Sequence, residues 1–200
     1  MNGIRLRHLA FTGPNIEPAK LEFVDGLNII YGASNTGKSF ASEAVLFMLG
    51  AVSKLSTIDE IKAYDAIWLG LTLGDQGEFT LYRATKGGNL KLFPGLITSH
   101  PTGKGEVLSW KHSAKGTDSV SYRILETLGL KDRWVVRNSS GEKEQVACRV
   151  LAKFAVVGEE DIISKRSPIY VSNSYTDRTL DQNLFKLLLT GQDDAAVVTV

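Results

Sequence analysis

Several features that would indicate particular classes of protein are scarce in this sequence. Its 200 residues include one cysteine, Cys148, so no disulfide can form within the chain, and we expect a reducing, cytoplasmic location. No apolar run reaches transmembrane length, and residues 1–5 lack the apolar core of a signal peptide, so we expect no membrane association. A net charge of +1 gives no global case for nucleic-acid binding, although it allows a local basic patch.

The composition is that of a globular protein. Hydrophobic residues make up 43% of the chain and charged residues 22%, which is typical of a folded domain rather than a disordered segment. The length is sufficient for one α/β domain with a sizeable core. The lone cysteine has no catalytic partner set in the sequence, so we interpret it as a small buried apolar residue.

Residues 32–39, GASNTGKS, carry the strongest functional signal. They match the phosphate-binding pattern G-x-x-x-x-G-K-[ST] at every fixed position. Glycines at the first and sixth positions let the backbone turn so that successive N–H groups face phosphate oxygens. Lys38 is the predicted catalytic residue, since it would reach the β- and γ-phosphates, and the Ser39 hydroxyl would ligate Mg²⁺. The predicted nucleotide-binding residues are Gly32, Ala33, Ser34, Asn35, Thr36, Gly37, Lys38, Ser39 and Phe40.

The flanks of this loop fit the strand-to-helix context that the motif requires. Residues 26–31 are a short apolar run, which predicts a buried strand. Residues 39–49 carry apolar side chains at helical spacing, and Gly50 is a typical C-terminal stop. The helix N-terminus would add its positive dipole end to the phosphate site.

The rest of the chain alternates strand and helix signals. Before the loop, strands are predicted at 4–11 and 19–24. After the helix we expect a polar helical segment at 56–63 and strands at 64–73, 78–85 and 89–93, followed by an exposed loop at 94–105. The remaining expected elements are a helix capped by Thr117 or Asp118 and running to 128, a hairpin at 134–147, a helix at 149–157, a strand at 168–171, and a helix capped by Thr179 or Asp181 and ending at 189.

The order of these elements resembles the N-terminal half of SMC-like ABC ATPases, a group that includes the SMC, RecF, RecN and SbcC-type proteins. The resemblance rests on an N-terminal strand pair, then LNIIYGASNTGKS, a helix and a hairpin, and on residues 162–168 and 185–194, which look like bacterial coiled-coil members. It implies an α/β P-loop NTPase fold of the ABC/SMC type, with a mixed sheet and an antiparallel N-terminal β-subdomain. The chain would be the N-terminal lobe only, with strands in 1–31, loop and helix in 32–50, a hairpin region in 64–93 and a helical, glutamine-loop-like region in 117–191.

The resemblance also implies cofactors and partners. ATP and Mg²⁺ would bind at the loop, the C-terminal lobe of the same head would complete the site, and two heads would dimerise on ATP. Residues 172–176 fall where the family has a glutamine loop, and Asn173 offers an amide oxygen to the metal in its place. The parent protein would be an ATPase of DNA repair, chromosome maintenance or phage defence, with DNA as a further partner, and the basic loop residues Lys104, Lys111, His112 and Lys115 could meet it.

Parts of the catalytic machinery have no clear counterpart. The runs 154–160 and 67–75 pair apolar residues with acids as a Walker B strand does, but a glycine interrupts the first and a hairpin turn holds Asp75 in the second. Residues 139–145 resemble an ABC signature motif, yet the turn of a hairpin explains them better. We therefore expect this segment to bind nucleotide and to hydrolyse it poorly. It ends where a coiled coil would begin, and we expect it to be a fragment.

Two alternative functions remain open. A self-contained phosphotransferase, such as a small-molecule kinase, would need arginines over the phosphates, and Arg166 and Arg178 are the clustered candidates. A non-catalytic assembly module would use ATP only to hold a dimer together. For Arg83, at the end of a predicted hairpin strand, two interpretations also remain open: it faces the nucleotide, or it is an ordinary exposed arginine.

Overall fold

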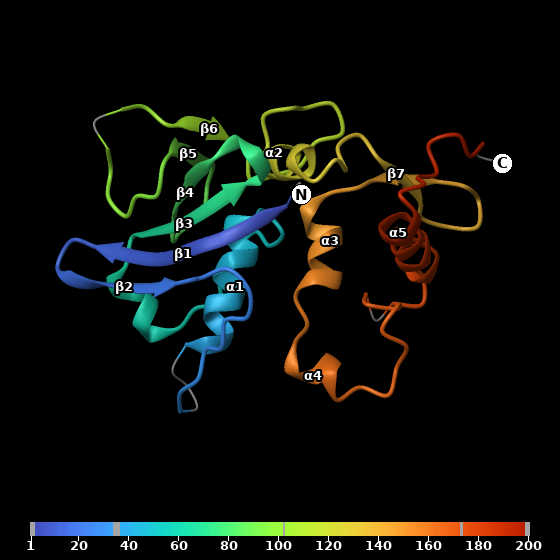
Figure 1. The fold of residues 1–200 in the computed structure, drawn as a ribbon. Helices are drawn as coiled ribbons and strands as arrows, with labels where there is room; N and C mark the ends of the chain where they lie inside the picture. Colours follow the sequence, from blue (N-terminus) through green and yellow to red (C-terminus); the bar gives the residue numbers. More distant parts are fainter. Residues whose placement is uncertain (1–2, 34–36, 102, 173, 199–200) are drawn as a thin grey trace. The chain divides into compact units, whose positions relative to one another are not determined.

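The computed structural model describes residues 3–33, 37–101, 103–172 and 174–198 (Figure 1). The chain divides into two compact units, Met1–Gly129 and Leu130–Val200. The first unit carries the phosphate-loop motif and a large sheet, and the second carries a small hairpin and three helices. None of the helices in the described part of the chain is both long and apolar enough to span a membrane.

A six-stranded sheet with the order β2-β1-β3-β4-β5-β6 forms the centre of the first unit. Each pairing between neighbouring strands is antiparallel, so the fold is α/β with a mostly antiparallel sheet. The strands are β1 (Ile4–Gly13), β2 (Ile16–Glu22), β3 (Ala66–Leu73), β4 (Glu78–Ala84), β5 (Leu90–Pro94) and β6 (Glu106–Leu108). The predicted strands at 4–11, 64–73, 78–85 and 89–93 are confirmed, and the antiparallel N-terminal subdomain is confirmed with them.

The prediction of a mixed sheet is wrong for the described residues. After the loop and helix, the chain returns through the short 3₁₀-helix η1 (Asp59–Ala63) to β3, which pairs antiparallel with β1. β1 thus has β2 on one side and β3 on the other, and residues 26–31 find no strand partner. The predicted strand at 26–31 is therefore absent, because an apolar run becomes a buried strand only between hydrogen-bonding neighbours. Of the predicted helical segment 56–63, only η1 forms.

Helix α1 (Lys38–Met48) packs against one face of this sheet (Figure 1). Its buried side chains, Ala41, Ala44, Phe47 and Met48, recur at helical spacing, as the sequence predicts. The helix ends in a Schellman turn: the N–H of Gly50, which has a φ of 71°, donates to the Phe47 carbonyl, and the N–H of Ala51 donates to that of Leu46. The predicted glycine stop is confirmed.

Arg83 anchors the C-terminal end of α1 to the sheet. Its side chain is fully buried, its guanidinium donates to the Phe47 carbonyl at 2.6 Å and to the Gly88 carbonyl at 3.0 Å, and it lies 3.7 Å from the centroid of the Phe47 ring. Burial lowers the pKa of Arg83 to about 10, so the group is still charged at neutral pH. A cation at a helix C-terminus interacts favourably with the negative end of the helix dipole. This interaction accounts for a buried arginine whose partners are carbonyl groups.

The opposite face of the sheet is covered by the segment 95–101. His8 lies on this face, where its Nε2 contacts the Ile97 carbonyl at 3.1 Å, and the Thr80 hydroxyl donates to the Gly95 carbonyl at 2.8 Å. The His8 ring lies directly over Gly70, where an added Cβ would come within 2.3 Å of Nδ1. Only glycine at position 70 leaves room for the imidazole.

The second unit holds a hairpin and helices. The predicted hairpin at 134–147 is confirmed as β7 (Trp134–Val136) and β8 (Lys143–Gln145), and Cys148 is buried, as predicted, at the start of α3 (Cys148–Ala155). The short α4 (Glu159–Ile162) and the longer α5 (Arg178–Thr190) follow. The strand predicted at 168–171 is absent, because these residues form turns with no strand beside them.

Two predicted helix caps are replaced by neighbouring residues. Helix α2 (Val120–Thr127) is capped by Ser119, whose hydroxyl accepts the Tyr122 N–H at 3.0 Å, rather than by Thr117 or Asp118. Helix α5 begins after Asp177. Asp181 instead is buried and accepts hydrogen bonds from the backbone and hydroxyl of Ser172.

Replacing Arg83 with Met keeps a long apolar stem but removes the donors for the Phe47 and Gly88 carbonyls. We expect the free energy of unfolding, measured by urea denaturation, to fall by about 2–4 kcal/mol. The same change at the exposed Arg137 serves as the control and should stay within about 0.5 kcal/mol of the parent. Equal effects at the two positions would contradict an anchoring role for Arg83.

The stability of the first unit should depend on the protonation of His8. Burial lowers the pKa of His8 below its ordinary value of 6.5, so the unfolded chain binds the proton more tightly than the folded protein. The contribution to stability should be complete above pH 6.5 and decline as the pH falls from there through the lower pKa of the folded state. In His8→Gln, whose amide can still donate to Ile97, denaturation measured across this range should show a smaller loss on acidification. An unchanged loss would exclude His8 as its source.

Candidate functional site

The phosphate-loop motif meets α1 as the sequence predicts. Gly37 adopts the left-handed conformation, with a φ of 81°, and its carbonyl accepts the first helical hydrogen bond, from the Ala41 N–H at 2.9 Å. Lys38 opens the helix and the exposed Ser39 follows in its first turn. Ser34, Asn35 and Thr36 lie outside the described residues, so the helix side of the motif is confirmed and the middle of the loop is not described.

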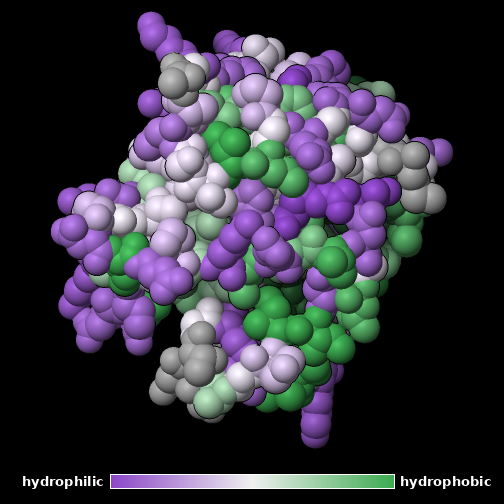
Figure 2. Space-filling model, turned by 60° about the vertical axis from the view of Figure 1, so that its left-hand side comes forward, coloured by the Kyte–Doolittle hydropathy of each residue, from purple (hydrophilic) through white to green (hydrophobic). Residues whose placement is uncertain are grey.

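On the other side of the motif, residues 27–33 run exposed and outside any strand. Leu27 is 84% exposed, Ile29 74% and Tyr31 90%, which is unusual for a run of such side chains. Figure 2 shows hydrophobic side chains exposed among hydrophilic ones on one face. The apolar side chains that led to the prediction of a buried strand are therefore exposed, and no other described residues cover them.

The Lys38 side chain reaches back across the loop. Its ammonium group donates to the Gly32 carbonyl at 2.9 Å and to the Ala33 carbonyl at 2.5 Å. These contacts join the two ends of the motif and hold a positive charge beside the first N–H groups of α1. Both the ammonium group and the helix N-terminus favour an anion at this position.

A cavity of about 930 Å³ opens beside this helix start. Gly37, Lys38, Ser39 and Phe40 contribute one side of it, β1 and β2 contribute a second, and residues 57–61 with Tyr64 contribute a third. Three of the lining side chains are aromatic: the Phe11 ring lies 5.9 Å from that of Phe40 and 6.0 Å from that of Tyr64, centroid to centroid. The site therefore combines a cationic end with an aromatic wall.

The rim of the cavity carries both signs of charge. Asp59 and Glu60 are exposed on η1, and Asp59 accepts a hydrogen bond from Lys62 at 2.5 Å. Lys20 of β2 lines the opposite side and is paired with Glu22. The cavity thus offers carboxylate acceptors as well as the ammonium group of Lys38, a combination that suits a ligand with an anionic end and hydroxyl or amine donors.

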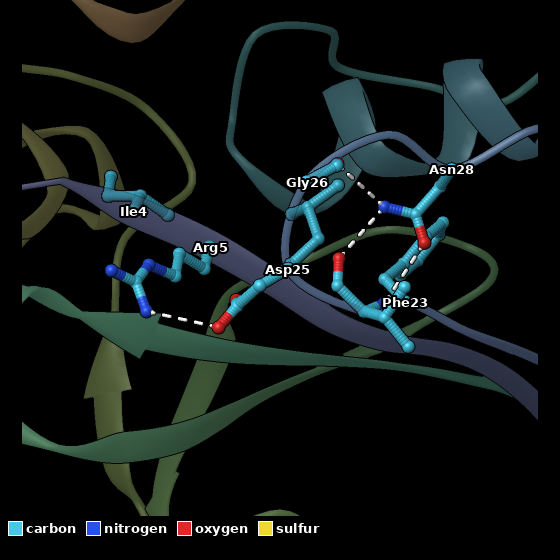
Figure 3. Close-up of a pocket in the computed structure, with 8 residues that line it drawn as sticks. Ile4, Arg5, Phe23, Asp25, Gly26 and Asn28 are labelled. Carbon is cyan, nitrogen blue, oxygen red and sulfur yellow. Dashed lines mark hydrogen bonds and ion pairs between the residues drawn. The ribbon is translucent and has the colours of Figure 1, made fainter.

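A second cavity, of about 620 Å³, lies where the chain leaves β2 (Figure 3). Arg5 and Arg7 both pair with Asp25, at 3.4 and 2.9 Å. The Asn28 side chain accepts the Val24 N–H and donates to the carbonyls of Val24 and Gly26, which fixes the turn leading into the phosphate loop. This cavity shapes the entry to the loop and contains no unpaired charge that would attract a ligand.

Other predicted site residues fall elsewhere. Asn173 lies outside the described residues. Arg166 and Arg178 belong to the second unit, where Arg166 bonds to Ser164 and Arg178 lies over the rings of Tyr170 and Tyr175. Both interpretations of Arg83 are wrong, since it is buried at the opposite end of α1 from Lys38.

The stretches weighed as catalytic motifs resolve into ordinary elements. Residues 139–145 form the turn and second strand of the β7–β8 hairpin. The run 154–160 crosses from the end of α3 into α4, and the run 67–75 is β3 followed by the turn that exposes Asp75. Among the described residues, His, Cys, Asp and Glu side chains form no group of three or more that could hold a metal ion.

Comparisons with protein-family models, curated proteins and solved structures found no match to this chain. The assignment of the site therefore depends on its own residues. Sequence reasoning missed the aromatic wall, because Phe11 and Tyr64 lie 53 positions apart in the chain and become neighbours only through sheet pairing. The sequence signal that could have predicted this wall is the position of Phe11 late in the first strand and of Tyr64 just before the third.

Replacing Gly37 with Ala tests the backbone at the start of α1. An added methyl group would meet no atom within 4 Å, so the cost comes from the left-handed conformation alone and should lower the free energy of unfolding by about 1 kcal/mol. Gly103→Ala, which also has open space but no positive φ, should change it by less than about 0.5 kcal/mol. Urea denaturation of both variants makes the comparison, and equal effects would contradict the conformation of Gly37.

Proposed function

We propose that this chain binds Mg-ATP through residues 32–39, as the N-terminal lobe of an SMC/RecN-like ATPase head. The observation that carries the proposal is the position of Lys38. Its ammonium group bridges back to Gly32 and Ala33 at the N-terminus of α1, and it does so beside a cavity large enough for a nucleoside. A chance match to the motif would not account for this combination.

In this proposal the phosphates lie at the helix start. Lys38 and the N–H groups at the beginning of α1 bind the β- and γ-phosphates, and the Ser39 hydroxyl holds the metal. Magnesium would neutralise phosphate charge there when bound. The exposed position of Ser39 on the first turn of α1, lining the cavity, fits a hydroxyl that must reach both a phosphate and an ion.

The nucleoside then occupies the cavity. A purine ring can pack against Phe11, Phe40 and Tyr64, because aromatic faces bind bases by stacking and apolar contact. The carboxylates of Asp59 and Glu60 at the rim can accept hydrogen bonds from ribose hydroxyls or from the base amine. Both ends of a nucleoside triphosphate thus meet suitable groups.

The exposed apolar run at 27–31 supports the second half of the proposal. Such side chains are buried when strands from elsewhere pair with them, and a C-terminal lobe would supply those strands. The residues that orient water and bind the metal in hydrolysis would come from that lobe and from a second head in a homodimer. We therefore assign ATP hydrolysis to the complete head and nucleotide binding to this chain.

Isothermal titration calorimetry with Mg-ATP tests the proposal. Lys38→Ala should weaken binding roughly 10- to 100-fold, because a charged hydrogen-bond donor to phosphate is lost. Lys104→Ala removes an exposed lysine that does not line the cavity and should leave the affinity unchanged. No saturable heat with the parent chain, or equal behaviour of the two variants, would refute phosphate binding by this loop.

A second variant tests the aromatic wall. Tyr64→Ala should weaken binding of ATP and of adenosine by a similar factor, about 5- to 100-fold, whereas Lys38→Ala should affect ATP much more than adenosine. For each variant, the loss of ATP affinity divided by the loss of adenosine affinity shows whether the replaced residue binds the phosphates or the nucleoside. If Tyr64→Ala left both affinities unchanged, the nucleoside would have to bind elsewhere. ATP-dependent dimerisation without phosphate release, measured by light scattering, would favour the assembly-module alternative.

A further inference from the structure

The segment that follows α1 returns along the helix to the nucleotide end. Helix α1 ends at Met48, yet residues 57–61 line the same cavity as residues 37–40 at the start of the helix. We call residues 56–63 the cavity strap. The strap forms one wall of the site and the phosphate-loop motif forms another, so the cavity keeps its shape only while the strap stays in place.

The C-terminal end of the cavity strap is fixed to the sheet through the backbone. The Ala63 carbonyl packs so closely on Gly13 of β1 that a Cβ at position 13 would come within 2.2 Å of its oxygen. Just beyond the strap, the Asp65 N–H donates to the Thr12 carbonyl at 2.9 Å. These contacts join this end of the strap to β1 without using any side chain of the strap.

The N-terminal end of the cavity strap is held by one side chain, that of Glu43 on α1. Its half-buried carboxylate accepts the Ser56 N–H at 2.5 Å. Residues 52–57 lie outside any helix or strand, and this is the only hydrogen bond that they make within the part of the chain that the structure describes. Hydrogen bonds from a backbone N–H to a carboxylate are stronger than those between neutral groups. Glu43 therefore fixes the end of the strap that the sheet does not hold.

The role of Glu43 is confined to the strap, since its side chain does not line the cavity. A carboxylate also has no proton to donate to a phosphate. The groups assigned above to the nucleoside, by contrast, depend on the strap: Asp59 and Glu60 belong to it, and Tyr64 follows it directly. A change at Glu43 should therefore reach the nucleoside and not the phosphates.

We infer that Glu43 is a positioning residue that makes the site select a nucleoside triphosphate over a bare triphosphate. The inference rests on the proposed function and adds to it a determinant of specificity. A wall that is already in place costs no ordering free energy when the nucleoside binds, whereas a loose wall must be ordered at that moment. A ligand without a nucleoside does not contact the strap and gains nothing from its position.

Isothermal titration calorimetry on the full 200-residue chain compares Mg-ATP with magnesium tripolyphosphate, which offers the phosphates alone. Glu43→Ala should weaken ATP binding about 3- to 10-fold, because one charge-assisted hydrogen bond and the preformed wall are lost. Binding of tripolyphosphate should change by less than about twofold. Lys38→Ala should instead weaken binding of both ligands, since it removes a phosphate contact.

Glu43→Gln is the matched control, because its amide oxygen can still accept the Ser56 N–H although the charge is gone. Its ATP affinity should stay within about twofold of the parent. Amide hydrogen exchange without nucleotide gives an independent measurement: the Ser56 N–H should exchange faster in Glu43→Ala but not in Glu43→Gln. The Ala41 N–H, which bonds to the Gly37 carbonyl, should keep its rate in both variants and so report that α1 is intact.

The outcomes separate this inference from the proposed function. A parent chain that bound neither ligand would refute the proposed function and the inference with it. If the parent binds ATP, the positioning role alone is overturned when the Glu43→Ala loss is absent, equal for the two ligands, or shared by Glu43→Gln. A loss confined to ATP in Glu43→Ala, with the affinity retained in Glu43→Gln, supports the inference.

Discussion

The contact between the Arg83 guanidinium and the end of α1 sets the arrangement of the first unit. A buried cation is costly unless dipoles or charges surround it, and here the carbonyls of Phe47 and Gly88 and the face of the Phe47 ring provide that environment. These contacts hold α1 on the sheet at one end. The aromatic contact of Phe11 with Phe40 holds it at the other.

Helix α1 therefore has two chemically different ends on one rigid element. Its N-terminus, with Lys38 folded over the loop, has the partial positive charge and the cavity that suit a nucleotide. Its C-terminus lies against the buried guanidinium of Arg83. The helix has eleven residues and packs as one rigid element. A displacement of the helix on its sheet would therefore move the residues at both of its ends together.

The sequence predicts those parts of the structure that local pattern decides. The helix after the motif, its glycine stop, the hairpins and the first strand follow from periodicity and turn residues, and they are confirmed. The apolar composition of 26–31 predicts a strand, but a strand also needs a hydrogen-bonding neighbour, which composition does not reveal. In the same way, the burial of Arg83 and the meeting of Phe11 with Tyr64 depend on the register of distant strands. The motif predicts a phosphate-binding loop and the helix after it, of which the helix is confirmed, whereas the aromatic wall of the cavity becomes visible only in three dimensions.

The close approach of His8 to Gly70 links two positions that lie 62 residues apart in the sequence. A side chain at position 70 would need the space that the imidazole fills, so the two sites can change only together, with the ring giving way to something smaller. In proteins that descend from the same ancestor, a glycine opposite a histidine and an alanine opposite a short residue should each recur as a pair. A histidine at position 8 together with any residue larger than glycine at position 70 should be rare. The two positions should therefore vary together among such proteins.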